Sequence, residues 1–102
     1  MRVIAGKFKR MNLFHEKSQE CRPTKDRIKE NIFNILSPSI EDASVCDLFC
    51  GTGGLGIEAL SRGAKRAVFI DKNIKLVQRN IDQIKIKFDS EIDGSCEIKR
   101  VL

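Results

Sequence analysis

Residues 45–60 read VCDLFCGTGGLGIEAL, and this stretch decides the fold class. Its first six residues are mostly apolar, which is typical of a strand covered on both faces of a sheet. Residues 51–54 make a tight glycine turn, and a helix is predicted from about Gly54 to Arg62, where Gly63 ends it. A strand, a glycine turn and a helix in this order predict one unit of a parallel α/β sheet.

A second unit follows. Residues 67–70, AVFI, predict a buried strand that ends at Asp71, and Asn73 is placed to cap a longer helix. The apolar residues of that helix recur every three or four positions, at Ile74, Val77, Ile81, Ile84 and Phe88. Residues 89–95 predict a loop and residues 96–102 a third strand. Residues 39–102 therefore predict the first half of a Rossmann-like, doubly wound parallel sheet.

Residues 1–38 predict a separate N-terminal segment. Residues 2–13 resemble a short hairpin, whose second arm, residues 8–13, mixes apolar and basic residues so that one face packs and the other stays cationic. Thr24 is a good N-cap for a helix through about Leu36, which Ser37 and Pro38 would end.

The net charge of +5 lies entirely in this segment. Residues 1–38 hold nine basic and four acidic residues, whereas residues 39–102 hold ten of each. A polyanionic partner would explain this asymmetry, and a solvated basic face is the alternative.

The composition restricts the number of domains, the expected location and the kinds of site. A chain of 102 residues predicts one domain or part of one. No apolar run reaches the roughly 18 residues of a membrane helix, and no signal peptide opens the chain, so a cytoplasmic protein without a membrane partner is expected. The four cysteines form no C-x-x-C pair, and no metal site is predicted.

The turn has the pattern G-x-G-x-x-G over Gly51, Gly53 and Gly56, and Asp71 follows Gly51 by twenty residues. Dinucleotide sites and S-adenosylmethionine sites both fit this pattern, since glycines admit a nucleoside to the backbone and a carboxylate binds ribose hydroxyls. Asp47 separates the two hypotheses. At ~4 Å and an effective dielectric near 20 it would repel a pyrophosphate charge by about 4 kcal/mol, but it would attract a sulfonium.

Structural alternatives stay open for each residue. Gly56 could serve only helix packing, Asp47 could brace the turn, and Asp71 could be a helix N-terminal acid. Phe49 is more typical of a core residue than of a base-stacking group.

Three segments resemble the bacterial 16S ribosomal RNA guanine-N2 methyltransferases, the RsmD-like group. They are RVIAGK at residues 2–7, RPTKDR at 22–27 followed by ENIFNIL at 30–36, and DLFCGTGGLGIEALSRGA at 47–64. The resemblance covers most of residues 1–88. It implies the class I S-adenosylmethionine-dependent methyltransferase fold and transfer of a methyl group to guanine N2 of small-subunit rRNA, free or in an assembling ribosomal subunit.

The resemblance also implies site residues. Gly51 and Gly53 would line the cofactor, Asp47 its methionine part and Asp71 its ribose, while Arg22 and Thr24 would contact the methionine carboxylate or only start the helix. The implied cofactor residues are Asp47, Phe49, Gly51, Thr52, Gly53, Asp71, Arg22 and Thr24. The implied contacts to RNA phosphates are Arg2, Lys7, Lys9 and Arg10.

The sequence departs from the family in one respect. Members carry an Asp/Asn-Pro-Pro-aromatic motif that holds the target amine, whereas the only prolines here are Pro23 and Pro38. We therefore expect no catalytic residue in this chain, no activity from it alone, and an unpaired edge on the strand at residues 45–50. A dinucleotide-binding oxidoreductase domain and a non-catalytic RNA-binding module are the alternative functions.

Overall fold

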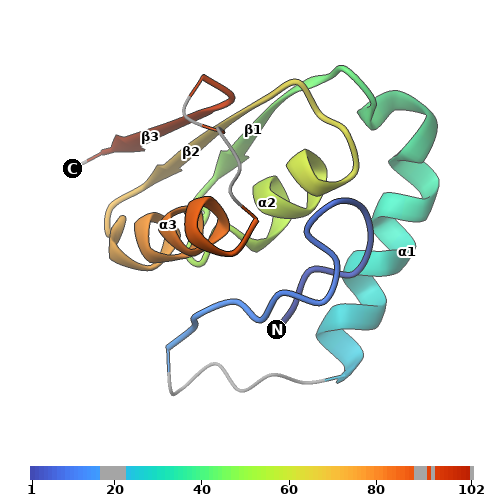
Figure 1. Ribbon diagram of the computed structural model, residues 1–102, viewed down its shortest axis with the longest axis horizontal. Helices are drawn as coiled ribbons and strands as arrows, with labels where there is room; N and C mark the ends of the chain where they lie inside the picture. Colours follow the sequence, from blue (N-terminus) through green and yellow to red (C-terminus); the bar gives the residue numbers. More distant parts are fainter. Residues whose placement is uncertain (17–22, 89–91, 93, 102) are drawn as a thin grey trace.

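The computed structural model describes residues 1–16, 23–88, 92 and 94–101, with the backbone alone at residues 23–25. The elements in chain order are α1 (Pro23–Ile40), β1 (Ser44–Leu48), α2 (Gly54–Ser61), β2 (Arg66–Asp71), α3 (Lys75–Lys87) and β3 (Cys96–Arg100). The strands form one parallel sheet in the order β1-β2-β3 (Figure 1). The predicted α/β fold with a parallel sheet is confirmed.

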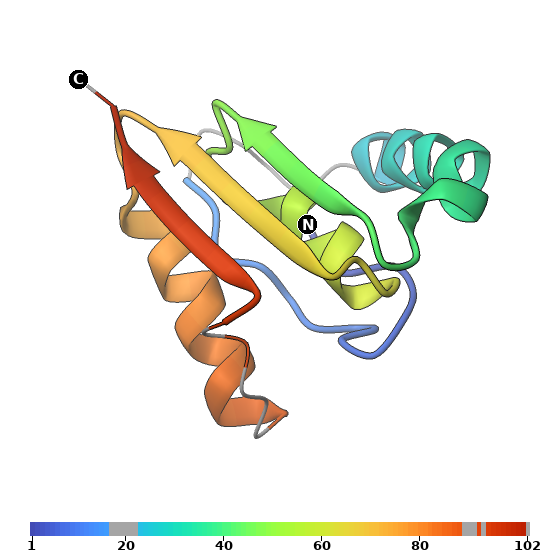
Figure 2. The same cartoon turned by 90° about the horizontal axis from the view of Figure 1, so that it is seen from above.

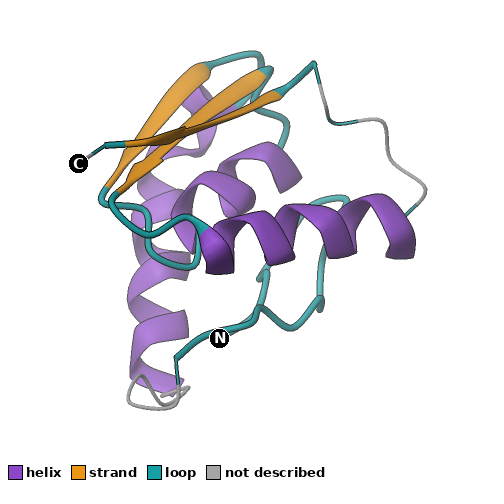
Figure 3. Ribbon diagram, turned by 90° about the vertical axis from the view of Figure 1, so that its left-hand side faces the viewer, coloured by secondary structure: helices purple, strands orange, loops and turns teal. Residues whose placement is uncertain are grey.

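The molecule is built in layers. Helices α2 and α3 cover one face of the sheet, and α1 lies beside β1 (Figure 2). The N-terminal segment, residues 1–16, packs against the side of α2 and α3 that is turned away from the sheet (Figures 1 and 3). The core lies between the sheet, these two helices and the N-terminal segment. Its most buried apolar side chains are Val3, Phe8, Ile57, Ala67, Phe69, Val77 and Ile84.

Strand β1 differs from the prediction. Its side chains alternate, because Asp47 is buried whereas Cys46 and Leu48 on the opposite face are exposed, Leu48 to 61%. Strand β1 is also at the edge of the sheet, and no helix in the described ranges covers its outer face (Figure 2). The expectation of a strand covered on both faces is therefore wrong for the part of the chain described, and the expected unpaired edge is present.

Helix α1 is longer than predicted. It begins at Pro23, so that Thr24 lies inside it, and it passes through Pro38 to end at Ile40. A proline in the last turn removes only one late backbone hydrogen bond, and the burial of Ile40, 6% exposed, favours continuation into the core. Neither this 18-residue helix nor another helix within the described residues is long and apolar enough to cross a bilayer.

The N-terminal hairpin is irregular. Its arms meet in one antiparallel bridge between Arg2 and Asn12, and the amide of Val3 donates to the carbonyl of Met11 at 2.9 Å. Gly6 has φ +88, and a Cβ there would overlap the backbone carbonyl of Ser61 in α2. The arms pair as predicted, but this close contact with α2 shapes them into a loop instead of two regular strands.

Candidate functional site

The glycine turn connects β1 to α2 and lies against the end of β2. Its backbone takes left-handed angles at Phe49 (φ 55), Gly51 (φ 54) and Gly53 (φ 82). The amide of Cys50 donates to the carbonyl of Ile70 at 3.0 Å. The turn therefore sits at the carboxyl ends of β1 and β2, where parallel sheets bind their ligands.

The three glycines of the pattern have different surroundings and therefore different structural roles. A Cβ on Gly51 would have nothing within 4 Å, so its backbone is open to a ligand. A Cβ on Gly53 would lie 2.6 Å from Cγ2 of Val77, and one on Gly56 would overlap the ring of Phe69. Gly56 thus permits close packing of helix on sheet, which was one of the two interpretations of its place in the pattern.

Asp71 joins the turn to the end of β2. Its Oδ2 accepts the amide of Gly51 at 2.7 Å, and its Oδ1 accepts those of Lys72 at 2.6 Å and Asn73 at 3.3 Å. The Gly51 amide, followed by those of Asn73 and Lys72, holds the pKa of this exposed carboxyl below its usual range. Since a carboxylate offers about four acceptor positions, one remains for a ligand hydroxyl.

A pocket of about 400 Å³ opens between the glycine turn and α1. The turn contributes Phe49, Cys50, Gly51, Thr52, Gly54 and Leu55, and α1 contributes Ile28, Lys29 and Ile32. Its volume is within the range of about 300–1,000 Å³ that is typical of small-molecule sites. The pocket contains three of the residues implied for the cofactor, which are Phe49, Gly51 and Thr52.

Phe49 and Thr52 sit differently in this pocket. Phe49 has a left-handed backbone and is 87% exposed, so the interpretation as a core residue is wrong. Thr52 is buried, and its Oγ1 accepts the amide of Gly54 at 3.1 Å. Of the two, only Phe49 offers a side chain to a ligand.

Asp47 braces the start of α2. Its Oδ2 accepts the amide of Gly56 at 3.0 Å, and the residue is only 9% exposed. It lines a separate groove of about 220 Å³ between α1, β1 and α2, instead of the pocket at the turn. Burial raises the pKa of its carboxyl, and the negative charge of Asp71 raises it further. The bracing role is present, and a role beside the cofactor stays a prediction.

The other implied residues belong to the N-terminal half. Arg22 and the side chain of Thr24 lie outside the described residues. The four basic residues of the loop, Arg2, Lys7, Lys9 and Arg10, are exposed. Three of them line one concavity, whereas the amine of Lys7 lies 5.5 Å from the centroid of the Phe8 ring.

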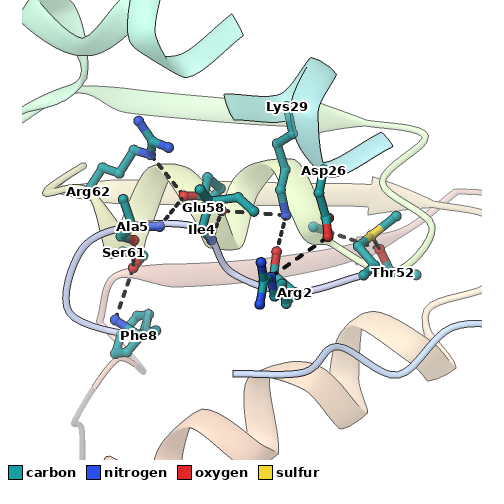
Figure 4. A network of polar contacts seen from close by, with 12 residues as sticks. Arg2, Ile4, Ala5, Phe8, Asp26, Lys29, Thr52, Glu58, Ser61 and Arg62 are labelled. Atoms are coloured by element: carbon teal, nitrogen blue, oxygen red, sulfur yellow. Dashed lines mark hydrogen bonds and ion pairs between the residues drawn. The ribbon is translucent and has the colours of Figure 1, made fainter. Parts of the chain in front are cut away.

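Glu58 of α2 holds the N-terminal segment in place (Figure 4). Its Oε1 accepts the amide of Ile4 at 2.8 Å, and its Oε2 accepts the amide of Ala5 at 3.1 Å and Nε of Arg62 at 2.8 Å. The side chain of Glu58 is fully buried. A carboxylate in this position is stable only because it accepts several donors, so it fixes the path of the loop.

Lys29 of α1 completes this cluster. Its amine lies 3.4 Å from Oε1 of Glu58 and donates to the carbonyl of Arg2 at 2.6 Å. Burial lowers the pKa of Lys29, although the negative charges of Glu58 and Asp26 oppose the change. The cluster links α1, α2 and the N-terminal segment at one point (Figure 4).

Asn80 of α3 ties the glycine turn to the N-terminal segment. Its Nδ2 donates to the carbonyls of Thr52 at 2.8 Å and Phe14 at 3.1 Å, and its Oδ1 accepts the amide of Phe14 at 2.8 Å. The residue is fully buried. Asn80 therefore supports the turn without facing the pocket.

Sequence reasoning missed Lys29, Glu58 and Asn80. Two of them carried a local signal: Glu58 interrupts the apolar run of residues 55–60, and Asn80 lies among the apolar positions of its helix. A polar residue on a face that is predicted to be buried needs a partner. Nothing in the local sequence shows that some of these partners, the amides of Ile4, Ala5 and Phe14, lie more than fifty residues away.

Comparison with known proteins agrees with this geometry. The structure resembles a solved Escherichia coli structure described as a methyltransferase, with a TM-score of 0.76, 33% identity, and coverage of 99% of this chain and 52% of the other. A Thermus protein of undescribed function, 23% identical, shows the same fold with a TM-score of 0.76. The fold is that of the class I methyltransferases.

The family follows from the sequence. A family profile described as conserved hypothetical protein 95 matches residues 1–97. The chain is 36% identical over 103 residues to the ribosomal RNA small subunit methyltransferase D of Haemophilus influenzae and 40% identical over 84 residues to that of Escherichia coli. This chain belongs to that family, the RsmD family of methyltransferases. It spans about half the length of these relatives, 53% and 42% respectively.

Proposed function

We propose that this chain binds S-adenosylmethionine at the glycine turn and supplies the cofactor part of a methyltransferase that acts on guanine N2 of small-subunit rRNA. One observation carries the proposal. The backbone of Gly51 is open on the side where a Cβ would project, and its amide is bound to Asp71 at the ends of the first two strands. The family and the names of the relatives support the same function.

The residues present fit this cofactor. Gly51 lets a nucleoside approach the backbone, and the remaining acceptor position of Asp71 suits a ribose hydroxyl. Phe49 offers an exposed ring to an apolar part of the ligand, and Ile28 and Ile32 of α1 add apolar side chains to the lining of the pocket. The cofactor supplies an electrophilic methyl group when it is bound.

Asp47 favours a sulfonium cofactor over a dinucleotide. Its carboxylate does not line the pocket, so we assign it a long-range electrostatic role in addition to bracing α2. A negative charge behind the turn attracts a cationic ligand and repels a pyrophosphate. Together with the family, this charge disfavours the oxidoreductase alternative.

We assign cofactor and RNA binding to this chain, and no catalytic residue. The Asp/Asn-Pro-Pro-aromatic motif that holds the target amine in the family does not occur in the sequence. The partner we propose is small-subunit rRNA or an assembling ribosomal subunit, which implies action in the cytoplasm. The basic residues of the N-terminal loop support the RNA part of the proposal.

Calorimetric titration with S-adenosylhomocysteine and with NAD tests the cofactor. We expect binding of the first and none of the second. Asp71→Asn should weaken binding about tenfold, because a charged acceptor for a hydroxyl is lost. The matched control is Asp42→Asn, an exposed aspartate whose φ of 61 asparagine also adopts. Binding of NAD alone, or equal affinities of the two variants, would contradict the proposal.

Asp47→Asn tests the electrostatic argument separately. Asparagine keeps an oxygen for the Gly56 amide but removes the charge. We expect the affinity for S-adenosylmethionine to fall more than that for S-adenosylhomocysteine, which lacks the sulfonium charge. Equal losses for both ligands would leave Asp47 as a structural brace only.

A further inference from the structure

We propose that the concavity between the N-terminal loop and the first turns of α1 binds a phosphodiester group of the RNA strand, and that Arg27 is part of this site. We call it the arginine pocket, defined by the basic residues Arg2, Lys9, Arg10 and Arg27. The inference rests on the proposed function for the identity of the ligand. It goes beyond that function by naming a pocket and a contact residue on α1.

The pocket has the size and the charge for this ligand. Its volume is about 480 Å³, and its four basic residues face two carboxylates, those of Asp26 and Glu30. The excess of two positive charges suits a phosphodiester backbone. Nε of Arg2 lies 3.9 Å from Oδ2 of Asp26, so one carboxylate also steadies an arginine whose side chain is 61% exposed.

The loop that carries three of these residues is held before any ligand arrives. Glu58 accepts the amides of Ile4 and Ala5, and Lys29 donates to the carbonyl of Arg2 (Figure 4). These bonds fix the backbone next to the arginine pocket. A fixed loop spares the cost of ordering its backbone on binding, which favours a binding site over a mobile basic tail.

The backbone of Arg10 takes a left-handed conformation. Its φ is 74, in the left-handed region that side-chain-bearing residues rarely adopt. Its amide donates to the carbonyl of Val3 at 2.9 Å, which holds the residue in this conformation. This bond fixes the backbone of a basic residue in the lining of the arginine pocket.

The arginine pocket adjoins the pocket at the glycine turn. Arg2 lines the first and Met1 the second, and along α1 Arg27 lines the first while Ile28 and Lys29 line the second. The linings of the two pockets therefore include consecutive residues of two segments, Met1 with Arg2 and Arg27 with Ile28.

The test is fluorescence anisotropy with the complete 102-residue chain and a short single-stranded RNA that carries fluorescein at its 5′ end. Arg27→Gln should weaken binding about tenfold, because a charge-assisted contact is lost. The slope of log affinity against log salt is negative, and its magnitude should decrease by about 0.7, the value for one phosphate contact on a single strand. Melting followed by circular dichroism shows that each variant is folded.

A second pair of variants removes the same charge at two places. Lys9→Gln lies in the arginine pocket and should also weaken RNA binding, whereas Lys65→Gln, exposed just before β2, should leave it within about twofold. Inorganic phosphate at matched ionic strength should displace the RNA only in large excess, because the strand makes further contacts outside the pocket. Displacement by an equal concentration of phosphate groups would show a site for a free anion and overturn the assignment to RNA.

Two further results would contradict the inference, and they can be told apart from a failure of the proposed function. If Arg27→Gln and Lys9→Gln bind RNA like Lys65→Gln, the arginine pocket is a solvated basic face and the inference is wrong. If the unaltered chain binds no RNA, the inference and the RNA part of the proposed function both fail. Titration with S-adenosylhomocysteine tests the cofactor part independently, and Arg27→Gln should leave that affinity unchanged.

Discussion

The amine of Lys29 lies 3.4 Å from Oε1 of Glu58, and these two side chains join α1 to α2 in the interior of the protein. The side chain of Glu58 is fully buried and that of Lys29 is 7% exposed. Both partners also bind the backbone of the N-terminal segment. The pair therefore helps to fix the position of the basic loop relative to the glycine turn.

Removing the charge of Glu58 should destabilise the fold. Glu58→Gln leaves Lys29 and Arg62 with an uncompensated buried charge, and we expect the free energy of unfolding to fall by about 3 kcal/mol. Urea denaturation followed by circular dichroism measures this change. Glu41→Gln, an exposed glutamate, is the matched control and should change stability by less than about 0.5 kcal/mol. Equal effects of the two changes would show that the cluster contributes little.

Gly51 and Gly56 should respond differently to alanine. Gly51→Ala has open space for its methyl group, so we expect a folded protein, a stability loss of about 1 kcal/mol from the left-handed backbone, and weaker cofactor binding. Gly56→Ala would collide with the ring of Phe69 and should cost about 1–3 kcal/mol or more. Thermal melting and titration with S-adenosylhomocysteine separate the two effects. A Gly51→Ala variant with unaltered affinity would count against the turn as the cofactor site.

The raised pKa of Asp47 predicts a pH-dependent effect of its replacement. A carboxyl with a higher pKa in the folded state stabilises the fold below its unfolded pKa of 3.8, and this contribution is lost as pH rises through the folded pKa. At neutral pH the buried charge therefore costs stability. Asp47→Asn should raise the free energy of unfolding at pH 7 relative to the parent, and the difference should shrink toward pH 4. Urea denaturation at both pH values measures it, and a difference independent of pH would refute this account.

The cysteines should differ in reactivity. Burial raises the pKa of the Cys50 thiol to about 12, and the charges of Asp47 and Asp71 contribute. Only about one thiol in ten thousand is then ionised at pH 8, and the thiolate is the reactive form. Iodoacetamide at pH 8 should modify the exposed Cys46 well before Cys50, as mass spectrometry of the peptides would show. In urea both residues should react, and equal rates in the folded protein would contradict the burial of Cys50.

Most elements were predictable because their signals are local. The glycine turn, α2, the second and third strands and α3 begin and end within a few residues of the predicted positions, since apolar spacing and glycine punctuation reflect backbone geometry over a few residues. The turn and Asp71 were recognisable as one candidate site for the same reason, and the structure brings them into contact. The packing role of Gly56 and the bracing role of Asp47 could be recognised only from the tertiary contacts.

The predictions that failed depend on what covers a segment. Leu48 looks like a core residue, yet it is exposed, because no described helix lies over the outer face of β1; Phe49, in the turn after it, is exposed as well. Helix α1 passes Pro38 because Ile40 packs into the core, which a local rule for proline does not include. Burial is a property of the whole arrangement and not of the residue type.

By itself, the sequence determined the α/β class, the glycine turn with Asp71, the concentration of positive charge in residues 1–38 and the family. The tertiary structure alone decided which charges meet. It brought Glu58 to amides more than fifty residues away, and it placed Arg27 of α1 and Arg10 of the loop in the lining of one pocket. The physical reason is range: backbone preferences act between near neighbours along the chain, whereas buried ion pairs and pockets depend on segments that only folding brings together.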